Sequence, residues 1–427
     1  LGLRAFFRFV LAKADRLSES SGGAQREGAL DKKSSVAPIP ELKSDSQRPP
    51  GFFAMKYTLN SRAQGLGLYP KALQEVISLD AHRAAATEIT SWDGYSPTPL
   101  ASAPGLAREM GVKAVRIKDE STRFGLKSFK ALGGAYGVFH ALQAHAEPGG
   151  LTVTCASDGN HGRAVAWGAR KYGCRAHIFL PTHVTEVRAE AIRALGATVE
   201  RVQGEYDDAV AKAAELGESP GYTVVSDTSY EGYDRIPRLV MQGYTVMAAE
   251  TLEQLGGSLP SHVFIQGGVG GLAAAVLGHL WEVLGADLPR VVLVEPETAD
   301  PLYQSALNGS VTASSGSLET VMAGLSCREA SPVAWAVLGL GAYGFMTVAD
   351  DGIHPLMRRL ASGELGEAIE AGESGVAGLL GALAASQDPG LRDLLGLDGD
   401  SQVLAFNTEG ATDPALYAKI LDCGIRE

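Results

Sequence analysis

The sequence has few cysteines, no long apolar run and fewer basic than acidic residues. Its four cysteines, Cys155, Cys174, Cys327 and Cys423, lie far apart without a CxxC pair, which argues against a zinc site or a disulfide framework and favours reduced thiols in the cytosol. No apolar run reaches about 18 residues, so no membrane-spanning helix is expected. Because 37 basic residues face 49 acidic ones, we expect neither nucleic acid nor an anionic membrane as a partner.

Glycine is abundant instead, at 52 of 427 residues. Glycines between apolar runs are typical of tight turns between strands and helices, and the chain is long enough for two domains. Strand-like runs occur at 112–120, 151–157, 174–181, 197–204, 222–228, 262–268, 290–297 and 401–410. Helical patterns separate these runs, which predicts an α/β fold with helices on both faces of a parallel sheet.

Residues 1–54 differ in composition from the rest of the chain. A basic amphipathic start is followed by a segment rich in Ser, Gly, Pro and charge, which lacks the apolar content that ordering requires. We interpret 1–54 as a disordered or non-native extension that precedes a plausible natural start at Met55. An organelle transit peptide is the alternative to the cytoplasmic location otherwise expected.

Lys130 stands at the expected start of a helix, in the apolar segment SFKALGG. Burial in such a place disfavours the ammonium form, and a neutral amine is the nucleophile that covalent catalysis needs. Lys127, one turn earlier among more polar neighbours, is expected to be an ordinary surface lysine.

The loop SDGNHG at 157–162 follows a strand and precedes a helix. Its glycines allow the backbone to approach a ligand, and the Asn160 amide can donate a hydrogen bond to it. Considered alone, the loop could equally be a helix cap with a turn. His161 is expected to be a packing residue, because no partner carboxylate can be assigned to it from the sequence.

A glycine-rich turn also lies between a strand and a helix. It contains Gly267, Gly268, Val269, Gly270 and Gly271. Backbone N–H groups at a helix N-terminus can bind a phosphate. A dinucleotide site is a rival interpretation, but the spacing is not G-x-G-x-x-G and the next acidic strand end is Glu295. A purely structural turn is the third possibility, and one phosphate is the most economical ligand.

Together these segments resemble the fold-type II (tryptophan-synthase-β-like) enzymes that use pyridoxal 5′-phosphate (PLP), and within them the diaminopropionate ammonia-lyase family. The likeness is carried by KDESTRFGLKSFKALGGAYG, SDGNHGRAVAWGARKYG, SDTSYEGYDRIPRLVMQGY, QGGVGGLAAAVLG, VEPETAD, VMAGLSC, GESGVAGL and NTEGATD. The resemblance implies a large PLP-binding domain at 55–133 and 250–427, an inserted smaller open α/β domain at 134–249, and a homodimer.

The resemblance also implies how PLP is held. Lys130 would form the Schiff base, Asn160 would meet the ring hydroxyl, and the glycine-rich turn would bind the phosphate. Many fold-type II enzymes place a Ser or Thr hydroxyl at the pyridine nitrogen. Here the matching strand end begins with Asn407, so this contact falls either to Asn407 or to Thr408.

The activity implied is an α,β-elimination that converts 2,3-diaminopropionate to pyruvate and two molecules of ammonia through an aminoacrylate. Lys130 would remove the Cα proton of one enantiomer and Asp158 that of the other. Asp227 would hold the leaving amino group as ammonium, with Asp158 able to share this role. The backbone at Ser157, Asp158 and Gly159 would contact the substrate carboxylate, and Asp227 would also bind the substrate. Without its surrounding motif, Asp227 would be assigned as a turn cap.

Other functions share these residues, and we expect no metal site in any of them. Relatives that dehydrate serine or threonine typically have a small neutral residue at the position of Asp158, so this aspartate favours a substrate with a second amino group. A serine/threonine dehydratase and a β-replacement synthase are the alternative enzymes. A non-catalytic PLP-binding protein is the alternative from a different class.

Overall fold

The computed structural model describes residues 55–145 and 150–422, so the predictions for 1–54 and for Cys423 lie outside the described residues. The strands form one sheet of seven and another of four. Among the described residues no helix is both long and apolar enough to cross a membrane.

The seven-stranded sheet has the order β1-β10-β9-β8-β11-β3-β2. Its strands are β1 (Tyr57–Leu59), β2 (Leu100–Ser102), β3 (Ala114–Asp119), β8 (His262–Gln266), β9 (Arg290–Pro296), β10 (Gly344–Val348) and β11 (Gln402–Asn407). The inner strands are parallel, as predicted, while β1 and β2 pair antiparallel at the two edges. The sequence patterns miss β1 and β2, which have three residues each, and β10, which follows an apolar helix without a polar break.

The four-stranded sheet is parallel and has the order β6-β5-β4-β7. Its strands are β4 (Thr152–Ala156), β5 (Arg175–Pro181), β6 (Thr198–Val202) and β7 (Tyr222–Val224). The predicted extent of β7, to residue 228, is wrong. The Ser226 N–H donates to the Tyr233 hydroxyl at 3.0 Å, so the chain leaves the sheet before Asp227, and this aspartate is free to turn toward other elements.

Fourteen α-helices connect and cover the sheets in the described part of the chain. They are α2 (Leu79–Ile89), α3 (Pro104–Met110), α4 (Lys130–Gln143), α5 (Asn160–Tyr172), α6 (Glu186–Arg193), α7 (Tyr206–Gly217), α8 (Arg235–Leu255), α9 (Gly271–Leu284), α10 (Pro301–Asn308), α11 (Pro332–Gly341), α12 (Ile353–Ala361), α13 (Ala377–Gln387), α14 (Pro389–Leu395) and α15 (Pro414–Asp422). Short 3-10 turns include η3 (Arg123–Gly125), η6 (Ala323–Leu325) and η8 (Glu373–Gly375).

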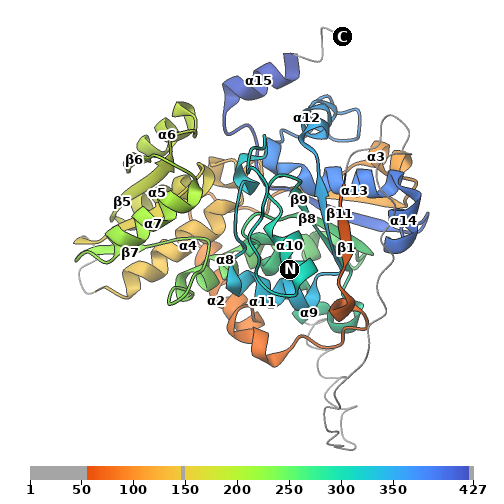
Figure 1. Cartoon of the computed structure of the whole chain (residues 1–427), viewed down its shortest axis with the longest axis horizontal. Coiled ribbons are helices and arrows are strands. Elements are labelled where there is room, and N and C mark those ends of the chain that lie inside the picture. Colours follow the sequence, from red (N-terminus) through yellow and green to blue (C-terminus); the bar gives the residue numbers. More distant parts are fainter. Residues whose placement is uncertain (1–54, 146–149, 423–427) are drawn as a thin grey trace, which may run out of the picture. The chain divides into compact units, whose positions relative to one another are not determined.

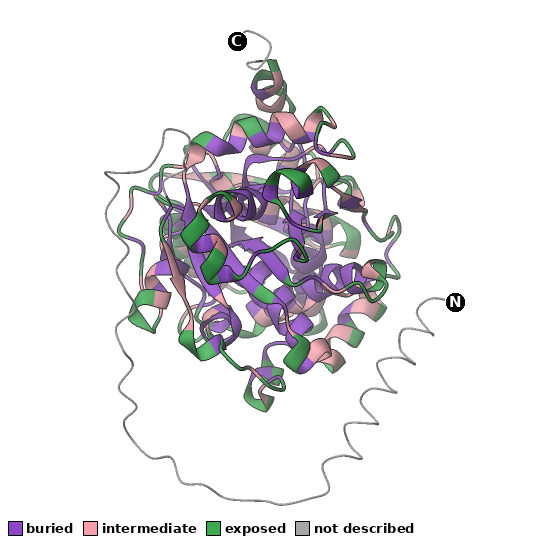
Figure 2. Ribbon diagram, turned by 90° about the vertical axis from the view of Figure 1, so that its right-hand side faces the viewer, coloured by how far each residue is buried: buried purple, intermediate pink, exposed green. Residues whose placement is uncertain are grey.

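Helix α4 lies between the two groups of strands and packs against both α5 and α8 (Figure 1). Close approach to α8 requires glycine at Gly133, because a Cβ there would lie 2.4 Å from Tyr244 Cε1. Strands β4, β8, β9, β10 and β11 are almost wholly buried, and the interior of the ribbon in Figure 2 is largely purple. Lys130, the first residue of α4, is therefore fixed at a tightly packed junction.

The division into domains can be compared with the positions of the strands. The strands of the smaller sheet all fall within 134–249, the range expected for the inserted domain, and those of the larger sheet fall outside it. However, α8 crosses residue 250 and packs against both α4 and α9. The domain boundaries therefore stay a prediction.

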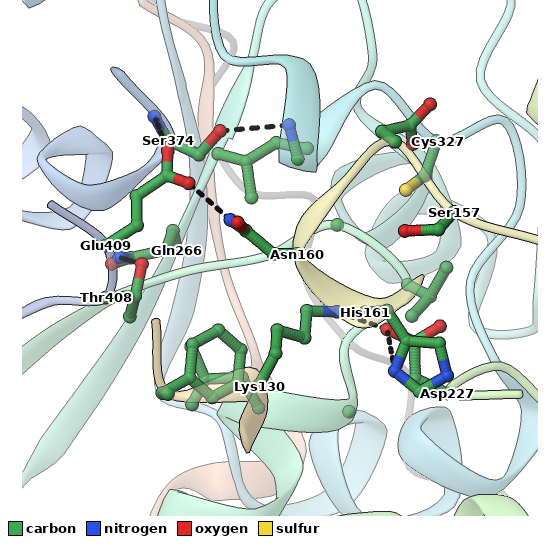
Figure 3. Close-up of a pocket in the computed structure, with 18 of the residues that line it drawn as sticks. Lys130, Ser157, Asn160, His161, Asp227, Gln266, Cys327, Ser374, Thr408 and Glu409 are labelled. Carbon is green, nitrogen blue, oxygen red and sulfur yellow. Dashed lines mark hydrogen bonds and ion pairs between the residues drawn. The ribbon is translucent and has the colours of Figure 1, made fainter. Parts of the chain in front are cut away.

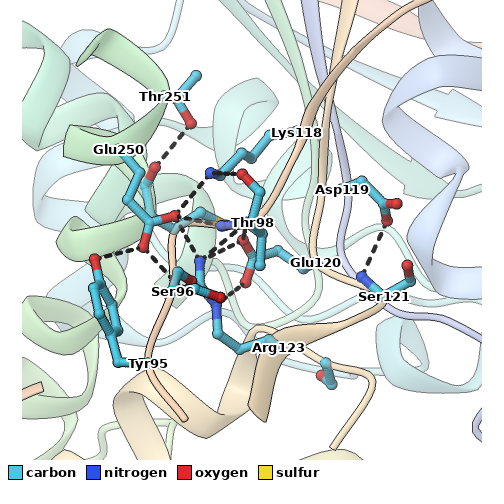
Figure 4. A network of polar contacts seen from close by, with 12 residues as sticks. Tyr95, Ser96, Thr98, Lys118, Asp119, Glu120, Ser121, Arg123, Glu250 and Thr251 are labelled. Atoms are coloured by element: carbon cyan, nitrogen blue, oxygen red, sulfur yellow. Dashed lines mark hydrogen bonds and ion pairs between the residues drawn. The ribbon is translucent and has the colours of Figure 1, made fainter. Parts of the chain in front are cut away.

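A buried network of charged side chains anchors the loop that leads into α4 (Figure 4). The Arg123 guanidinium donates to both carboxylate oxygens of Glu120, each at 2.8 Å, and to both oxygens of Glu250, at 2.9 and 2.8 Å. The Lys118 ammonium lies 2.7 Å from Glu250. All four side chains are at most 5% exposed, so two cations and two anions balance each other away from water.

We predict that Glu250→Gln strongly destabilises the protein. The substitution leaves two buried cations facing one carboxylate, and breaking a buried ion pair from one side costs about 3–5 kcal/mol of unfolding free energy. Urea denaturation followed by circular dichroism measures this change. Glu253→Gln, at an exposed position of the same helix, is the matched control and should change the unfolding free energy by less than about 0.5 kcal/mol. Equal losses in both variants would contradict a special role for the network.

Candidate active site

A cavity lies where the carboxyl ends of β4, β8 and β11 meet the start of α4 (Figure 3). Its lining includes Lys130, the 157–161 loop, Asp227, the glycine-rich turn and Thr408. Ligands of parallel α/β sheets bind at this edge, because the loops after the strands converge there. Most residues singled out in the sequence therefore share one cavity. Gly267 and Asn407 are the two that do not line it.

The Lys130 ammonium pairs with the Asp227 carboxylate across the cavity wall. The side chain of Lys130 keeps 21% of its surface exposed, while that of Asp227 keeps 7%. Burial lowers the pKa of Lys130, but the charge of Asp227 outweighs burial and raises the pKa above its usual value. The expectation that burial leaves Lys130 a neutral amine considered burial alone, and the Asp227 carboxylate, which comes from a distant segment, opposes that effect.

Asp227 belongs to the loop after β7 and has three polar neighbours. Burial would raise its pKa, but Lys130 and His161 pull it below the usual range. His161 itself is buried, which lowers its pKa, so we assign the main effect to Lys130. The His161 ring lies 3.8 Å from the carboxylate, and the Tyr206 hydroxyl donates to it at 3.4 Å. His161 is buried, as expected for a packing residue. The sequence offered no partner carboxylate for it, but the structure shows that Asp227 is this partner.

Asp158 lines the same cavity from the loop between β4 and α5. Burial raises its pKa to about 7, an effect that the nearby Arg188 opposes and Asp227 reinforces. The side chain is 15% exposed, and the His183 ring lies 3.8 Å from one of its oxygens. A carboxyl with such a pKa can take up or release a proton near neutral pH.

The other residues of this loop are fixed by Ser157. Its hydroxyl oxygen accepts hydrogen bonds from the Gly159 N–H at 2.9 Å and from the Gly162 N–H at 2.8 Å. These two amides are therefore occupied within the loop, and the Ser157 O–H remains as a donor. Gly159 has a φ of 135°, which other residues rarely adopt, and this conformation lets α5 begin at Asn160.

Asn160 projects into the cavity and donates to the Glu409 carboxylate. Glu409 follows β11, is 4% exposed, and also accepts the Ser374 N–H at 3.0 Å. The sequence patterns gave Glu409 no role, because its partner Asn160 is 249 residues away in the chain. A signal was nevertheless present, since Glu409 follows directly on the polar strand end at 407–408.

The glycine-rich turn ends at the N-terminus of α9, which spans Gly271–Leu284. Gly270 caps the helix with a φ of 93°, and a Cβ on Gly268 would lie 3.2 Å from both Cys327 Sγ and the Gly324 carbonyl oxygen. The N–H of Gly267 instead donates to β9, to the Val294 carbonyl oxygen at 2.9 Å. The rest of the turn offers its backbone to the cavity.

The rival dinucleotide site lacks its acidic residue. Glu295 is fully buried and accepts the N–H groups of Leu302 and Tyr303 at 2.9 and 2.7 Å. Its carboxyl oxygens thus cap the start of α10 and are not available to a ribose.

Asn407 and Thr408 point to different surroundings at the end of β11. The Asn407 amide donates to Asp119 at 2.7 Å and to the Glu370 carbonyl oxygen at 3.1 Å. Thr408 lines the cavity, and its hydroxyl oxygen accepts from the Gln266 amide at 2.7 Å. Because this oxygen is occupied as an acceptor, the Thr408 O–H is left to donate to a ligand.

These residues fit PLP. A lysine stands at the cavity, a helix N-terminus with a glycine turn suits a phosphate, and Thr408 offers a hydroxyl donor for a neutral ring nitrogen. In addition, the Tyr244 hydroxyl and Gln266 Oε1 line the cavity as buried polar atoms without a protein partner among the described residues. Such atoms are costly unless a ligand satisfies them.

Two other sequence expectations concern residues near this cavity. Lys127 is 38% exposed and pairs with Glu370 at 2.8 Å, which agrees with the surface position expected for it. Cys327 lines the cavity but is 7% exposed, and burial raises the pKa of its thiol. It is a free thiol, as the wide spacing of the cysteines predicted.

Comparison with known proteins agrees with this geometry. Residues 91–407 match the family described as "Pyridoxal-phosphate dependent enzyme". The chain is 38% identical over 351 residues to diaminopropionate ammonia-lyase of Escherichia coli K12, covering 77% of this chain and 88% of that protein. It is 33% identical over 403 residues to the Salmonella typhimurium protein of the same name, covering 86% and 98% of the two chains.

A solved structure gives the same result. The crystal structure of E. coli diaminopropionate ammonia lyase in complex with an aminoacrylate–PLP azomethine reaction intermediate matches with a TM-score of 0.80 and 35% sequence identity. The match covers 88% of this chain and 99% of that chain. The fold-type II architecture and PLP dependence predicted from the sequence are thereby confirmed, and the chain belongs to the diaminopropionate ammonia-lyase family of PLP-dependent enzymes.

Proposed function

We propose that this chain eliminates the β-amino group of 2,3-diaminopropionate and, with the uptake of one water, yields pyruvate and two molecules of ammonia. The observation that carries the proposal is the pairing of Asp227 with an ammonium group in a cavity that Asp158 also lines. A substrate with a second amino group presents a β-ammonium that can pair with Asp227 in place of the Lys130 ammonium, while Asp158 is left to act on the Cα proton. The activity named for the E. coli and S. typhimurium relatives supports the same substrate.

We assign cofactor contacts to residues that line the cavity. When bound to Lys130, PLP supplies an electron sink for the negative charge that develops at Cα. The backbone of Gly268, Gly270 and the start of α9 is suited to hold the phosphate. Asn160 and Thr408 are suited to contact the ring, and Thr408 is preferred over Asn407 because only the former lines the cavity.

Asp227 is assigned to the leaving group. Its carboxylate pairs with the ammonium of Lys130. When Lys130 is neutral, as an amine that accepts the Cα proton must be, the same carboxylate can bind the β-ammonium of the substrate and keep it protonated. A protonated amine leaves as neutral ammonia, whereas an unprotonated one would have to leave as amide ion.

Proton removal from Cα is assigned to Lys130 for one enantiomer and to Asp158 for the other. The two groups reach the cavity from different elements, α4 and the loop after β4. Asp158, with its pKa of about 7, is partly ionised near neutral pH and is therefore able to accept a proton.

A hydroxyl substrate such as serine would need only one of these carboxylates. A dehydratase or a β-replacement synthase would give no role to one of the two buried aspartates, Asp158 and Asp227. The ammonia-lyase activity is therefore preferred over these two alternatives. The homodimer and the cytoplasmic location stay predictions, and sedimentation velocity of the holoenzyme tests the homodimer.

We predict that Asp227→Asn lowers kcat/KM for diaminopropionate by about 10²- to 10⁴-fold, the usual contribution of a positioned acid or base. Elimination from serine should fall less, because its leaving group carries no charge to be held. Pyruvate release on both substrates measures the two values. Asp234→Asn, at a surface position paired with Arg238, serves as the control and should keep both activities. Equal losses on both substrates would refute the assignment of Asp227 to the β-ammonium.

We further predict a pH dependence that belongs to Asp158. Because its pKa is raised to about 7, the carboxyl is protonated below this pH and cannot accept the Cα proton. For the enantiomer that Asp158 serves, kcat/KM should rise as the pH increases through about 7 and level off above it. Asp158→Asn should abolish turnover of that enantiomer and spare the other. Pyruvate release from D- and L-diaminopropionate between pH 5.5 and about 9 tests this, and loss of both enantiomers would contradict separate bases.

A further inference from the structure

The cavity contains one cation that the proposed mechanism leaves without a task. Its ionisable lining comprises Lys130, Arg188, Asp158, Asp227, Glu409, His161, Tyr206, Tyr244 and Cys327. Burial lowers the pKa of His161 and raises those of the two tyrosines and of Cys327, which keeps these groups neutral. Lys130 is used by the cofactor. Arg188 is therefore the charged donor of the described cavity that stays available to a substrate.

The position of Arg188 suits a carboxylate ligand. It lies in α6, and its Nη1 is 3.4 Å from the Asp158 carbonyl oxygen. Its stem covers Gly159, where a Cβ would lie 3.1 Å from Arg188 Cδ. The guanidinium thus lies over the loop that was expected to bind the substrate carboxylate through its backbone. Its Nε is a buried donor without a protein partner among the described residues.

Two backbone donors of the loop are not available for this task. The Gly159 and Gly162 N–H groups are already bonded to Ser157 Oγ. A substrate carboxylate placed at the loop would also lie near Asp158, which repels it whenever that group is ionised. A cation at the same place offsets the repulsion, and a guanidinium can donate two parallel hydrogen bonds to a carboxylate.

We propose that Arg188 binds the α-carboxylate of the amino-acid substrate and makes that group a requirement for productive binding; this rests on the proposed function only in taking the substrate to be an amino acid. The charges of the cavity then divide by partner. Asp227 faces the β-ammonium, Asp158 acts on the Cα proton, and Arg188 faces the carboxylate. Glu409 is occupied by Asn160 and the Ser374 N–H.

The test compares two ligands that differ in the carboxylate and carry no leaving group. Alanine has the α-carboxylate, and alaninamide replaces it with a neutral amide. The dissociation constant of each is measured on the holoenzyme by titrating the absorbance of the bound cofactor. Because no elimination occurs, the measurement is independent of turnover.

Arg188→Gln should weaken alanine binding by about 10- to 100-fold, the range expected for a hydrogen-bonded charge, and leave alaninamide binding within a few-fold. Arg188→Lys, which keeps the charge, should recover part of the loss. Arg193→Gln removes an arginine of the same helix that pairs with Glu186 and Glu190, and it should change neither constant. Cofactor content, determined in each variant, checks that the site is assembled.

An equal loss for both ligands in Arg188→Gln, or no loss for either, would overturn the proposal, and the lysine variant decides if the glutamine variant does not fold. The proposed function fails separately, by the absence of pyruvate from diaminopropionate with the unmodified holoenzyme. In that case a selective effect of Arg188→Gln on alanine would still stand.

Discussion

The buried charges around Arg123 are the constraint on which the position of the site depends. They join the end of β3, the turn η3 and helix α8, three elements that the chain brings together only on folding. The loop that follows contains Phe124 and Lys127 at positive φ, a conformation that non-glycine residues adopt at a cost. Fixing its start through Arg123 and its end through α4 holds Lys130 at one place relative to α8.

The cavity is organised by the pairing of opposite charges at low exposure. Asp227 pairs with Lys130 and raises its pKa, and Lys130 in turn lowers the pKa of Asp227. Asp158 has no such cation in direct contact, so burial dominates and its pKa rises to about 7. Two aspartates in one cavity thereby acquire different proton affinities, which suits one to hold a charge and the other to transfer a proton.

The same principle connects the cofactor contacts with the frame of the larger sheet. Thr408, Glu409 and Gln266 lie at the ends of adjacent strands β11 and β8. Gln266 occupies the acceptor side of the Thr408 hydroxyl, and Glu409 holds Asn160 across the cavity. Thr408 and Asn160, the two side chains assigned to the cofactor ring, come from different segments of the chain. Hydrogen bonds to neighbouring side chains thus fix the orientation of both.

Much of this could be predicted from the sequence, because the relevant signals are local. The turn around Gly268 and Gly270 needs glycine for its backbone conformation, so it can be recognised between a strand and a helix. Lys130 is recognised by the apolar segment around it at the start of α4. The alternation of strands and helices predicts the parallel sheet. The short antiparallel edges β1 and β2 carry too few residues for such a signal. The motif order sufficed to identify the family, since each motif keeps its own local chemistry.

The tertiary structure alone decided which groups face each other. It set the Lys130 pairing with Asp227, which reverses the protonation state expected from burial. In the structure Asn407 bonds to Asp119 and does not line the cavity, whereas Glu409 and Arg188 do line it. The physical reason is that proton affinity and hydrogen-bond direction depend on partners a few ångströms away. The sequence by itself determined which chemical groups this protein has and the family to which it belongs, whereas the packing of α4, α6 and the strand ends determined what those groups can do.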